Sequence, residues 1–242
     1  MGYHVEASDF GMTKPFGAEV FMLGFLGIVE MDKDILLYIQ DHWRGGFFDG
    51  FFSLITHLGD VGIFWMVLTA ILLCFKKTRK AGFISAIALV GSVLLNNVIL
   101  KNLIGRERPY NVFDELHLLK GIKEASDASF PSGHTAASFA SCVAILPNVK
   151  KRWWAPLILM AVLISFSRIY IGIHYPSDIV GGFVSGVILG ISANFIGNYI
   201  INKLTAKAHD SEGPLRFFGA FFGDVNPAEA AGTEAPAEEP KQ

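Results

Sequence analysis

Three short motifs of this chain place ionisable residues at the ends of strongly apolar segments. They read Lys101-x6-Arg108-Pro109, Pro131-Ser132-Gly133-His134 and Ser167-Arg168-x5-His174-x3-Asp178. Charge beside such apolar sequence is costly, so we interpret these residues as functional. Together the motifs supply three cations, two imidazoles and one carboxylate. This set suits the binding of an anion, and phosphate first.

The second and third motifs have the pattern of helix starts. Ser132 is a typical N-cap residue, and Gly133 after it would let the backbone come close to a ligand. The run Tyr175-Pro176-Ser177-Asp178 predicts another start, because Pro and Ser open helices and an acidic residue is favoured in the first turn. Two helix N-termini whose free N–H groups face one pocket would form an anion site.

The cations of the motifs could hold a phosphate without a metal. Lys101, Arg108 and Arg168 would neutralise its oxygens, and each guanidinium can bind two of them at once. Phosphoryl transfer depends mainly on positioning and electrostatics, so a fixed group of cations can take the role that a metal has elsewhere. We therefore expect no metal and no other cofactor.

The two histidines could carry the chemical steps. His174 and Asp178 are four residues apart, so the carboxylate can accept a hydrogen bond from one ring nitrogen and leave the other free to attack phosphorus. His134 would then be placed to protonate the leaving oxygen. This division of roles predicts a reaction through a covalent phosphohistidine.

Taken singly, each motif has a simpler interpretation. A cation near a helix end often extends to the membrane interface, and an isolated histidine usually makes a structural hydrogen bond. All three patterns, in order and on one predicted side of a membrane, argue against separate coincidences. His42, His57 and His117 have no comparable motif around them. We assign Asp60 and the pair Asn96-Asn97 to hydrogen bonds between helices.

The composition is that of an integral membrane protein. Of the 242 residues, 52% are hydrophobic and 17% are charged, and the mean hydropathy is +0.43, which is too apolar for an ordinary soluble domain. The net charge is -2, and the absence of a basic run interleaved with aromatic residues argues against a nucleic-acid partner. Cys74 and Cys142 both lie in apolar runs, so we expect them to form neither a disulfide nor a metal site.

Apolar runs predict an all-α fold, a polytopic transmembrane helical bundle of five to six spans. The five expected spans are residues 61–75, 81–104, 135–146, 153–170 and 179–201. The run 47–58 contains Asp49 and His57, and we favour it as an extension of the first span across Gly59-Asp60 over a short interfacial helix. The run 16–29 is short and carries Glu19, so a sixth span and a membrane-associated helix both stay open.

The loops predict the orientation of the bundle. Cations are dense at residues 76–80 and 150–152, and Lys203 and Lys207 follow the last span, so these places should face the cytoplasm. Alternation then puts the three motifs on the extracytoplasmic side of the cell membrane. The outer loop 105–130 carries cations as well. This agrees with the enrichment of cations on the cytoplasmic side only if some of the loop's cations are functional.

The chain divides into three parts. Residues 1–46 are an amino-terminal membrane-associated segment, and residues 47–204 are the transmembrane domain that holds the motifs. Residues 205–242 form an acidic tail rich in Ala, Pro and Glu, which we expect to be disordered because it has too little apolar surface to bury.

In its three motifs the chain resembles the type 2 phosphatidic acid phosphatases, a family that shares its site with the vanadium-dependent haloperoxidases and bacterial acid phosphatases. The family signature is complete between Lys101 and Asp178. The resemblance implies that His174 is the nucleophile, Asp178 its orienting partner and His134 the general acid. It implies that the phosphate ligands are Lys101, Arg108, Ser132, Gly133 and Arg168.

The resemblance implies an integral membrane lipid phosphate phosphatase whose partners are the bilayer and a lipid phosphate; protein partners stay open. We favour undecaprenyl diphosphate as substrate, because an outward site reaches the leaflet where this carrier is recycled. A diphosphate would also offer extra oxygens to Arg106, Lys120 or Lys123 at the mouth of the pocket. The alternatives are a phosphatidylglycerol phosphate or phosphatidate phosphatase, a vanadium haloperoxidase and a membrane transporter.

Overall fold

The computed structural model describes residues 16–209 and 221–222, with side chains described in 27–206 and 221–222. Over these residues the chain is helical and has no strand, as the predicted fold class requires. The α-helices are α1 (Phe16–His42), α2 (Gly46–Leu58), α3 (Ile63–Cys74), α4 (Arg79–Ser92), α5 (Lys101–Ile104), α6 (Pro109–Val112), α7 (Gly133–Ile145), α8 (Trp154–Tyr170) and α9 (Pro176–His209).

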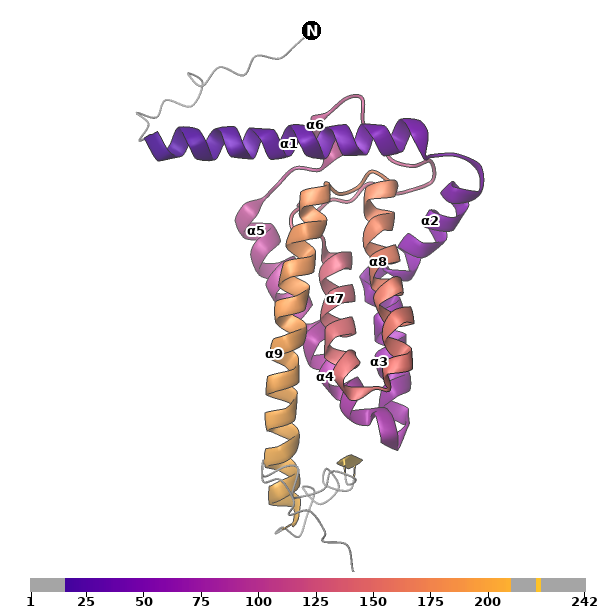
Figure 1. Ribbon diagram of the computed structural model, residues 1–242, viewed down its shortest axis with the longest axis vertical. Helices are drawn as coiled ribbons and strands as arrows, with labels where there is room; N and C mark the ends of the chain where they lie inside the picture. Colours follow the sequence, from indigo (N-terminus) through magenta and orange to yellow (C-terminus); the bar gives the residue numbers. More distant parts are fainter. Residues whose placement is uncertain (1–15, 210–220, 223–242) are drawn as a thin grey trace, which may run out of the picture.

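Helix α7 lies at the centre of a bundle, where it packs against α4, α8 and α9 (Figure 1). Most of its buried positions are small residues, which include Ala136, Ala140 and Ala144. Small side chains let neighbouring backbones come close, which gives dense packing between helices in a membrane. The sequence of α7 therefore accounts for its central position.

A stripe of glycines on α9 sets the distance to α7. A Cβ atom at Gly182, Gly186 or Gly190 would lie 2.6 to 2.8 Å from a backbone oxygen of Ser132 or of α7, so no larger residue fits there. The backbone N–H of Ser132 donates to the carbonyl oxygen of Asp178 at 3.1 Å. The glycine stripe thus holds the second and third motifs side by side.

Fewer helices meet the length and apolarity of a membrane span than the five to six that the sequence predicted. Three stretches are long and apolar enough, Lys76–Val112, Lys151–Tyr170 and Pro176–Ala206, and α2 with α3 make a fourth if this pair, bent by 50°, is one span. Helix α7 has only 13 residues, so it falls short of the usual length although it lies inside the bundle. Five to six spans are therefore not confirmed.

Helix α1 lies across one end of the bundle instead of running along it (Figure 1). Polar residues interrupt its second half, and it is absent from the described stretches that could span a membrane. Its buried face includes Leu36, which packs with Leu116 and Tyr175. The structure therefore favours a membrane-associated helix over a sixth span at residues 16–29.

The last helix extends past the residue where we expected the tail to begin. Helix α9 passes residue 204 and ends at His209, so residues 205–209 are helical. Phe221 lies against the start of α4, with the Arg79 guanidinium 4.3 Å from its ring centroid. The rest of the predicted tail, including residues 224–242, lies outside the described residues.

Between α4 and α5 the chain forms a π-helical segment, Val93–Leu100. Wider turns of this kind are frequent at functional sites, and Lys101 follows directly. Asn96 in this segment is fully buried and accepts a hydrogen bond from the Ser185 hydroxyl of α9 at 2.7 Å. The hydrogen bond between helices that the sequence predicted for Asn96 is therefore confirmed.

Candidate active site

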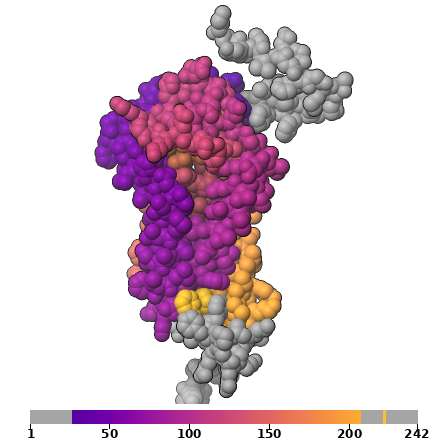
Figure 2. Space-filling model, turned by 180° about the vertical axis from the view of Figure 1, so that it is seen from behind, coloured from indigo at the N-terminus to yellow at the C-terminus, as the bar shows by residue number. Residues whose placement is uncertain are grey.

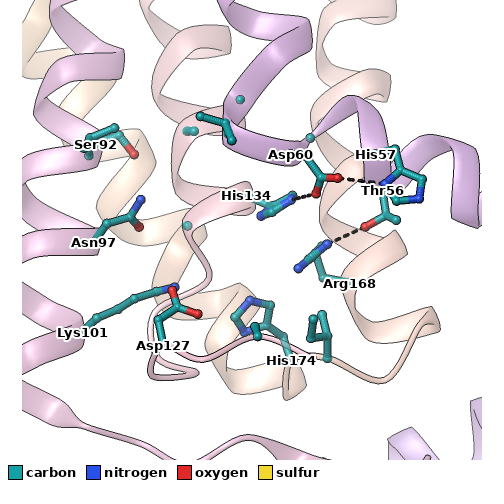
Figure 3. A pocket seen from close by; sticks show the side chains of 18 of the residues that line it. Thr56, His57, Asp60, Ser92, Asn97, Lys101, Asp127, His134, Arg168 and His174 are labelled. Atoms are coloured by element: carbon teal, nitrogen blue, oxygen red, sulfur yellow. Dashed lines mark hydrogen bonds and ion pairs between the residues drawn. The ribbon is translucent and has the colours of Figure 1, made fainter. Parts of the chain in front are cut away.

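The three motifs meet at one cavity of about 890 Å³ near the end of the bundle that α1 covers (Figure 3). Figure 2 shows its hollow from outside, between α2 and α3 on one side and α4 on the other. Ser132 and Asp178 are fully buried next to it. The motif residues that line the cavity are Lys101, Arg108, Gly133, His134, Arg168 and His174.

His174 and Asp178 form a buried pair at the start of α9. The His174 Nδ1 lies 3.2 Å from Asp178 Oδ2, and Nε2 faces the Arg108 guanidinium at 3.4 Å. The same carboxylate oxygen accepts hydrogen bonds from the Tyr175 N–H and the Ser129 hydroxyl, at 3.0 and 2.5 Å. With its proton on Nδ1, the ring presents the lone pair of Nε2 toward Arg108, which lines the cavity.

Burial sets the protonation state of His174. It lowers the pKa of this imidazole to about 3, although the hydrogen bond and charge of Asp178 act in the opposite direction. The ring is therefore neutral near pH 7, which a nucleophile requires.

Lys101 and Arg108 share a carboxylate that sequence reasoning missed. Both cations are buried, and the two Asp127 oxygens bind one each: Oδ2 the Lys101 ammonium and Oδ1 the Arg108 Nη2, the latter at 2.6 Å. Partial burial opposes ionisation, yet hydrogen bonds and charge from these cations lower the pKa of Asp127 to about 2. The carboxylate bridges the cations as two oxygens of a phosphate would.

Arg168 is held from α2. Its Nη1 donates to the Thr56 hydroxyl at 2.6 Å, while its Nε is buried without a hydrogen-bond partner among the described atoms. A buried guanidinium with an unfilled donor is costly unless a ligand completes its contacts. Thr56 lies in an apolar run without a recognisable pattern, so the sequence offered no signal for it.

His134 has a carboxylate partner of its own. Its Nε2 lies 3.1 Å from Asp60 Oδ1, and Asp60 Oδ2 lies 2.8 Å from the His57 Nδ1 (Figure 3). The Nδ1 of His134 has no partner within the described part of the chain. Asp60 does bond across helices, but it lines the cavity and belongs to the site. His57, which the sequence left outside the site, bonds to the carboxylate that pairs with His134 and lines the same cavity.

Two glycines leave room for the site. A Cβ on Gly133 would lie 2.6 Å from Asn97 Oδ1, and one on Gly59 would lie 2.6 Å from His134 Cδ2. Ser132 holds the N-cap position of α7 as predicted, but it makes no side-chain capping bond. Its hydroxyl accepts from Thr135 Oγ1 at 3.1 Å instead.

The site holds the carboxylates of Asp60, Asp127 and Asp178 beside its three cations. No group of three or more His, Cys, Asp and Glu side chains in the described ranges could hold a metal ion. Three buried cations around a neutral imidazole provide what an anionic substrate and its transition state need.

Comparison with known proteins decides the family. The model of the PAP2 superfamily matches residues 79–200, which contain all three motifs. The chain belongs to the PAP2 superfamily. Among curated relatives, the undecaprenyl-diphosphatase BcrC of Bacillus subtilis is 33% identical over 67% of this chain and 89% of its own. The Lipid A 4'-phosphatase of Bacteroides thetaiotaomicron is 30% identical over 82% and 88% of the two chains.

Other similar proteins support the assignment to the PAP2 superfamily. The undecaprenyl-diphosphatase of Sulfolobus acidocaldarius is 37% identical over 50% of this chain, a stretch that spans 58% of that relative. Among solved structures, the PAP2 type phosphatidylglycerolphosphate phosphatase of Bacillus subtilis has a TM-score of 0.59 and 26% identity, covering 78% of this chain and 98% of its own. The chain is thus a membrane lipid phosphatase of this superfamily.

Outside the PAP2 match, α1 contributes a residue that sequence reasoning missed. Asp32 is fully buried, and its carboxylate accepts from the Ser177 N–H at 2.9 Å and from Arg106 Nη2 at 3.0 Å. Arg106 Nη1 donates to Asp178 Oδ1 at 2.7 Å, and its guanidinium lies 3.8 Å from the Tyr175 ring centroid. Asp32 and Arg106 therefore support the pair formed by Asp178 and His174.

These contacts correct the expectation for the mouth of the pocket. The buried carboxylates of Asp32 and Asp178 hold the Arg106 guanidinium, and Arg106 does not line the cavity. Lys123 lines the cavity, whereas Lys120 does not.

Proposed function

We propose that this membrane lipid phosphatase hydrolyses undecaprenyl diphosphate through a phosphohistidine, on the extracytoplasmic face of the membrane. The observation that carries the proposal is the position of the His174 Nε2, which faces a cavity that Lys101, Arg108 and Arg168 also line. Two of the relatives are undecaprenyl-diphosphatases, which supports this substrate over the glycerolipids.

The reaction takes two steps at His174. In the first, Nε2 attacks the terminal phosphorus, the bond from phosphorus to the bridging oxygen breaks, and His134 donates a proton to that oxygen. The lipid monophosphate leaves. In the second, His134 takes a proton from water, the oxygen of that water attacks phosphorus, the bond from phosphorus to Nε2 breaks, and inorganic phosphate is released from the regenerated His174. Burial and the charge of Arg168 lower the pKa of His134 to about 4, and the hydrogen bond with Asp60 opposes this shift and favours the protonated state that His134 needs for the first step.

Three cations would bind the transferred phosphate. Its oxygens would take the contacts that Asp127 makes with Lys101 and Arg108, and would also meet Arg168. Of the mouth residues considered for the second phosphate, Lys123 remains, and His57 lines the same cavity.

The lipid chain would leave the site sideways. The cavity continues along apolar residues of α3, α4 and the π-helical segment, and several are exposed on the outside of the bundle (Figure 2). These are Met66, Val90, Val93 and Leu94. Such an opening suits a substrate whose chain stays in the bilayer while its headgroup enters the site.

A substrate panel tests the proposal. The purified enzyme is given undecaprenyl diphosphate, phosphatidate, phosphatidylglycerol phosphate and lipid A in the same micelles, with excess EDTA, and phosphate release is measured. We expect the highest kcat/KM with undecaprenyl diphosphate, and inhibition by vanadate. A clear preference for a glycerolipid or lipid A would reject the substrate while keeping the phosphatase, and Mg²⁺-dependent recovery from EDTA would reject the cation mechanism.

The proposed sidedness has a separate test. In a background with Cys74 and Cys142 replaced by Ser, a single cysteine at Asn111 should react with an impermeant thiol reagent added to intact cells. A single cysteine at Thr78 should not react. The reverse labelling would place the active site on the cytoplasmic face.

A further inference from the structure

A second cavity, of about 860 Å³, lies at the end of the bundle away from the active site. It is formed where α3 ends, α7 ends and α8 begins, near the lower end of the bundle in Figure 1. Its walls are mostly apolar and include Leu68, Leu72 and Leu157. Leu68 and Leu72 are one turn apart on α3, so they form a continuous apolar surface along the bundle axis.

Cations surround the same cavity. Lys77, Lys80, Lys150 and Arg152 line it, and within the described part of the chain no hydrogen bond or ion pair neutralises the three lysines. The sequence explains why: residues 61–106, 128–177 and 179–209 contain no Asp or Glu. This end of the bundle therefore carries positive charge that its own helices do not balance.

Tryptophans mark this end as a membrane interface. Trp153 lines the cavity and is half exposed, with the Arg152 guanidinium 5.7 Å from its ring centroid. Trp154 follows it and donates its indole N–H to the Leu146 carbonyl oxygen at 2.8 Å. Tryptophan is enriched at the level of the lipid headgroups, so the cavity lies where headgroup and acyl chain meet.

We propose that this cavity binds one anionic phospholipid, with its phosphate among the four cations and an acyl chain along Leu68 and Leu72. Basic pockets between membrane helices suit such headgroups, because the cations attract the phosphate and the apolar walls accept the chain. The acidic segment 224–242 matches the charge but contains only one residue larger than Ala that is aliphatic, Val225. It could not cover the apolar walls, so we assign the site to lipid.

Paired charge variants test this site in the full-length enzyme. Lys77→Gln with Lys150→Gln removes two cations that line the cavity. Lys76→Gln with Lys151→Gln is the matched control, because it removes the same charge from neighbouring exposed positions that do not line it. Native mass spectrometry of protein titrated with dioleoyl phosphatidylglycerol or dioleoyl phosphatidylcholine measures binding, and retained phosphatase activity shows that both variants are folded.

We expect the unmodified enzyme to bind phosphatidylglycerol more tightly than phosphatidylcholine. The cavity variant should lose about 25-fold in affinity for phosphatidylglycerol, if each lysine beside the bound phosphate contributes as much as one beside an anionic membrane surface. The control should lose about threefold or less, because its lysines lie outside the cavity and farther from the phosphate. Free glycerol 1-phosphate should not displace the lipid, since it lacks the chain. Equal losses in both variants, no loss in either, no preference for phosphatidylglycerol, or displacement by glycerol 1-phosphate would each overturn the proposal.

Discussion

Replacing Asp32 by Asn tests whether α1 helps to position the catalytic pair. Asn keeps the shape of the side chain and one oxygen for the Ser177 N–H, but it removes the negative charge that faces Arg106. Hydrogen bonds to charged groups contribute about 1.5–3 kcal/mol, and removal of one partner from a buried ion pair costs about 3–5 kcal/mol. Arg106 keeps Asp178 and remains partly exposed, so we expect a loss of about 2–3 kcal/mol in unfolding free energy.

The effect on catalysis should exceed a simple loss of stability. Without Asp32, the guanidinium of Arg106 has Asp178 as its single charged partner among the described contacts and can pull this carboxylate away from His174. Small misplacements of reacting groups cost up to about 100-fold in rate. We therefore expect kcat for a lipid diphosphate to fall about 10- to 100-fold, with KM nearly unchanged, because the phosphate-binding cations do not contact Asp32.

The assay compares three variants in the same micelles, below the unfolding temperature of the weakest. Asp34→Asn is the matched control, because Asp34 lies on the same helix and is exposed. Arg106→Lys keeps the charge but cannot bridge two carboxylates, so it should resemble Asp32→Asn. If Asp32→Asn lowers the unfolding temperature but leaves kcat within twofold of the control, α1 only stabilises the fold and the positioning role is refuted.

Three further predictions concern the site itself. His174→Ala should abolish turnover, whereas His134→Ala should lose about 10²- to 10⁴-fold and accumulate phosphoenzyme from a substrate with a good leaving group; substantial activity in His174→Ala would remove it as nucleophile. Gly133→Ala should lower activity because its Cβ would meet Asn97 Oδ1 at 2.6 Å, and adding Asn97→Ala should restore part of it; an unchanged loss in the double variant would contradict this steric cause. Burial lowers the pKa of His174 to about 3, so the unfolded chain binds this proton first and stability should fall as pH drops from about 6.5 toward 3. His174→Gln should therefore flatten the dependence of unfolding temperature on pH between these values, and an unaltered slope would mean that another group causes it.

The sequence was most informative where helix ends carry functional residues. Apolar runs alternate across a membrane, so the ends that hold Lys101, His134 and His174 had to fall on one side, and the structure places all three at one cavity. Pro176 starts α9 and Asp178 lies in its first turn, as the pattern of helix-starting residues predicted.

Residues that depend on tertiary contacts could not be predicted in this way. Asp127 lies in a loop without periodicity, and nothing near it in the sequence indicates Lys101 or Arg108 as partners. Asp32 interrupts the apolar pattern of α1, which gave a weak signal, but its partner Arg106 is 74 residues away. The predicted number of spans is not confirmed, because apolar composition identifies α7 as a segment without showing that it has only 13 residues.

The glycine contacts between α7 and α9 make the enzyme a favourable scaffold for altering chain-length selectivity. Close approach of main-chain atoms at these glycines helps to fix the spacing of the two histidines that we propose to be catalytic. Substitutions along the sideways opening, at Met66 or Val93 for example, can therefore change how much room a lipid tail has without moving the chemistry. Libraries confined to that wall should yield variants with new tail preferences and an intact reaction centre.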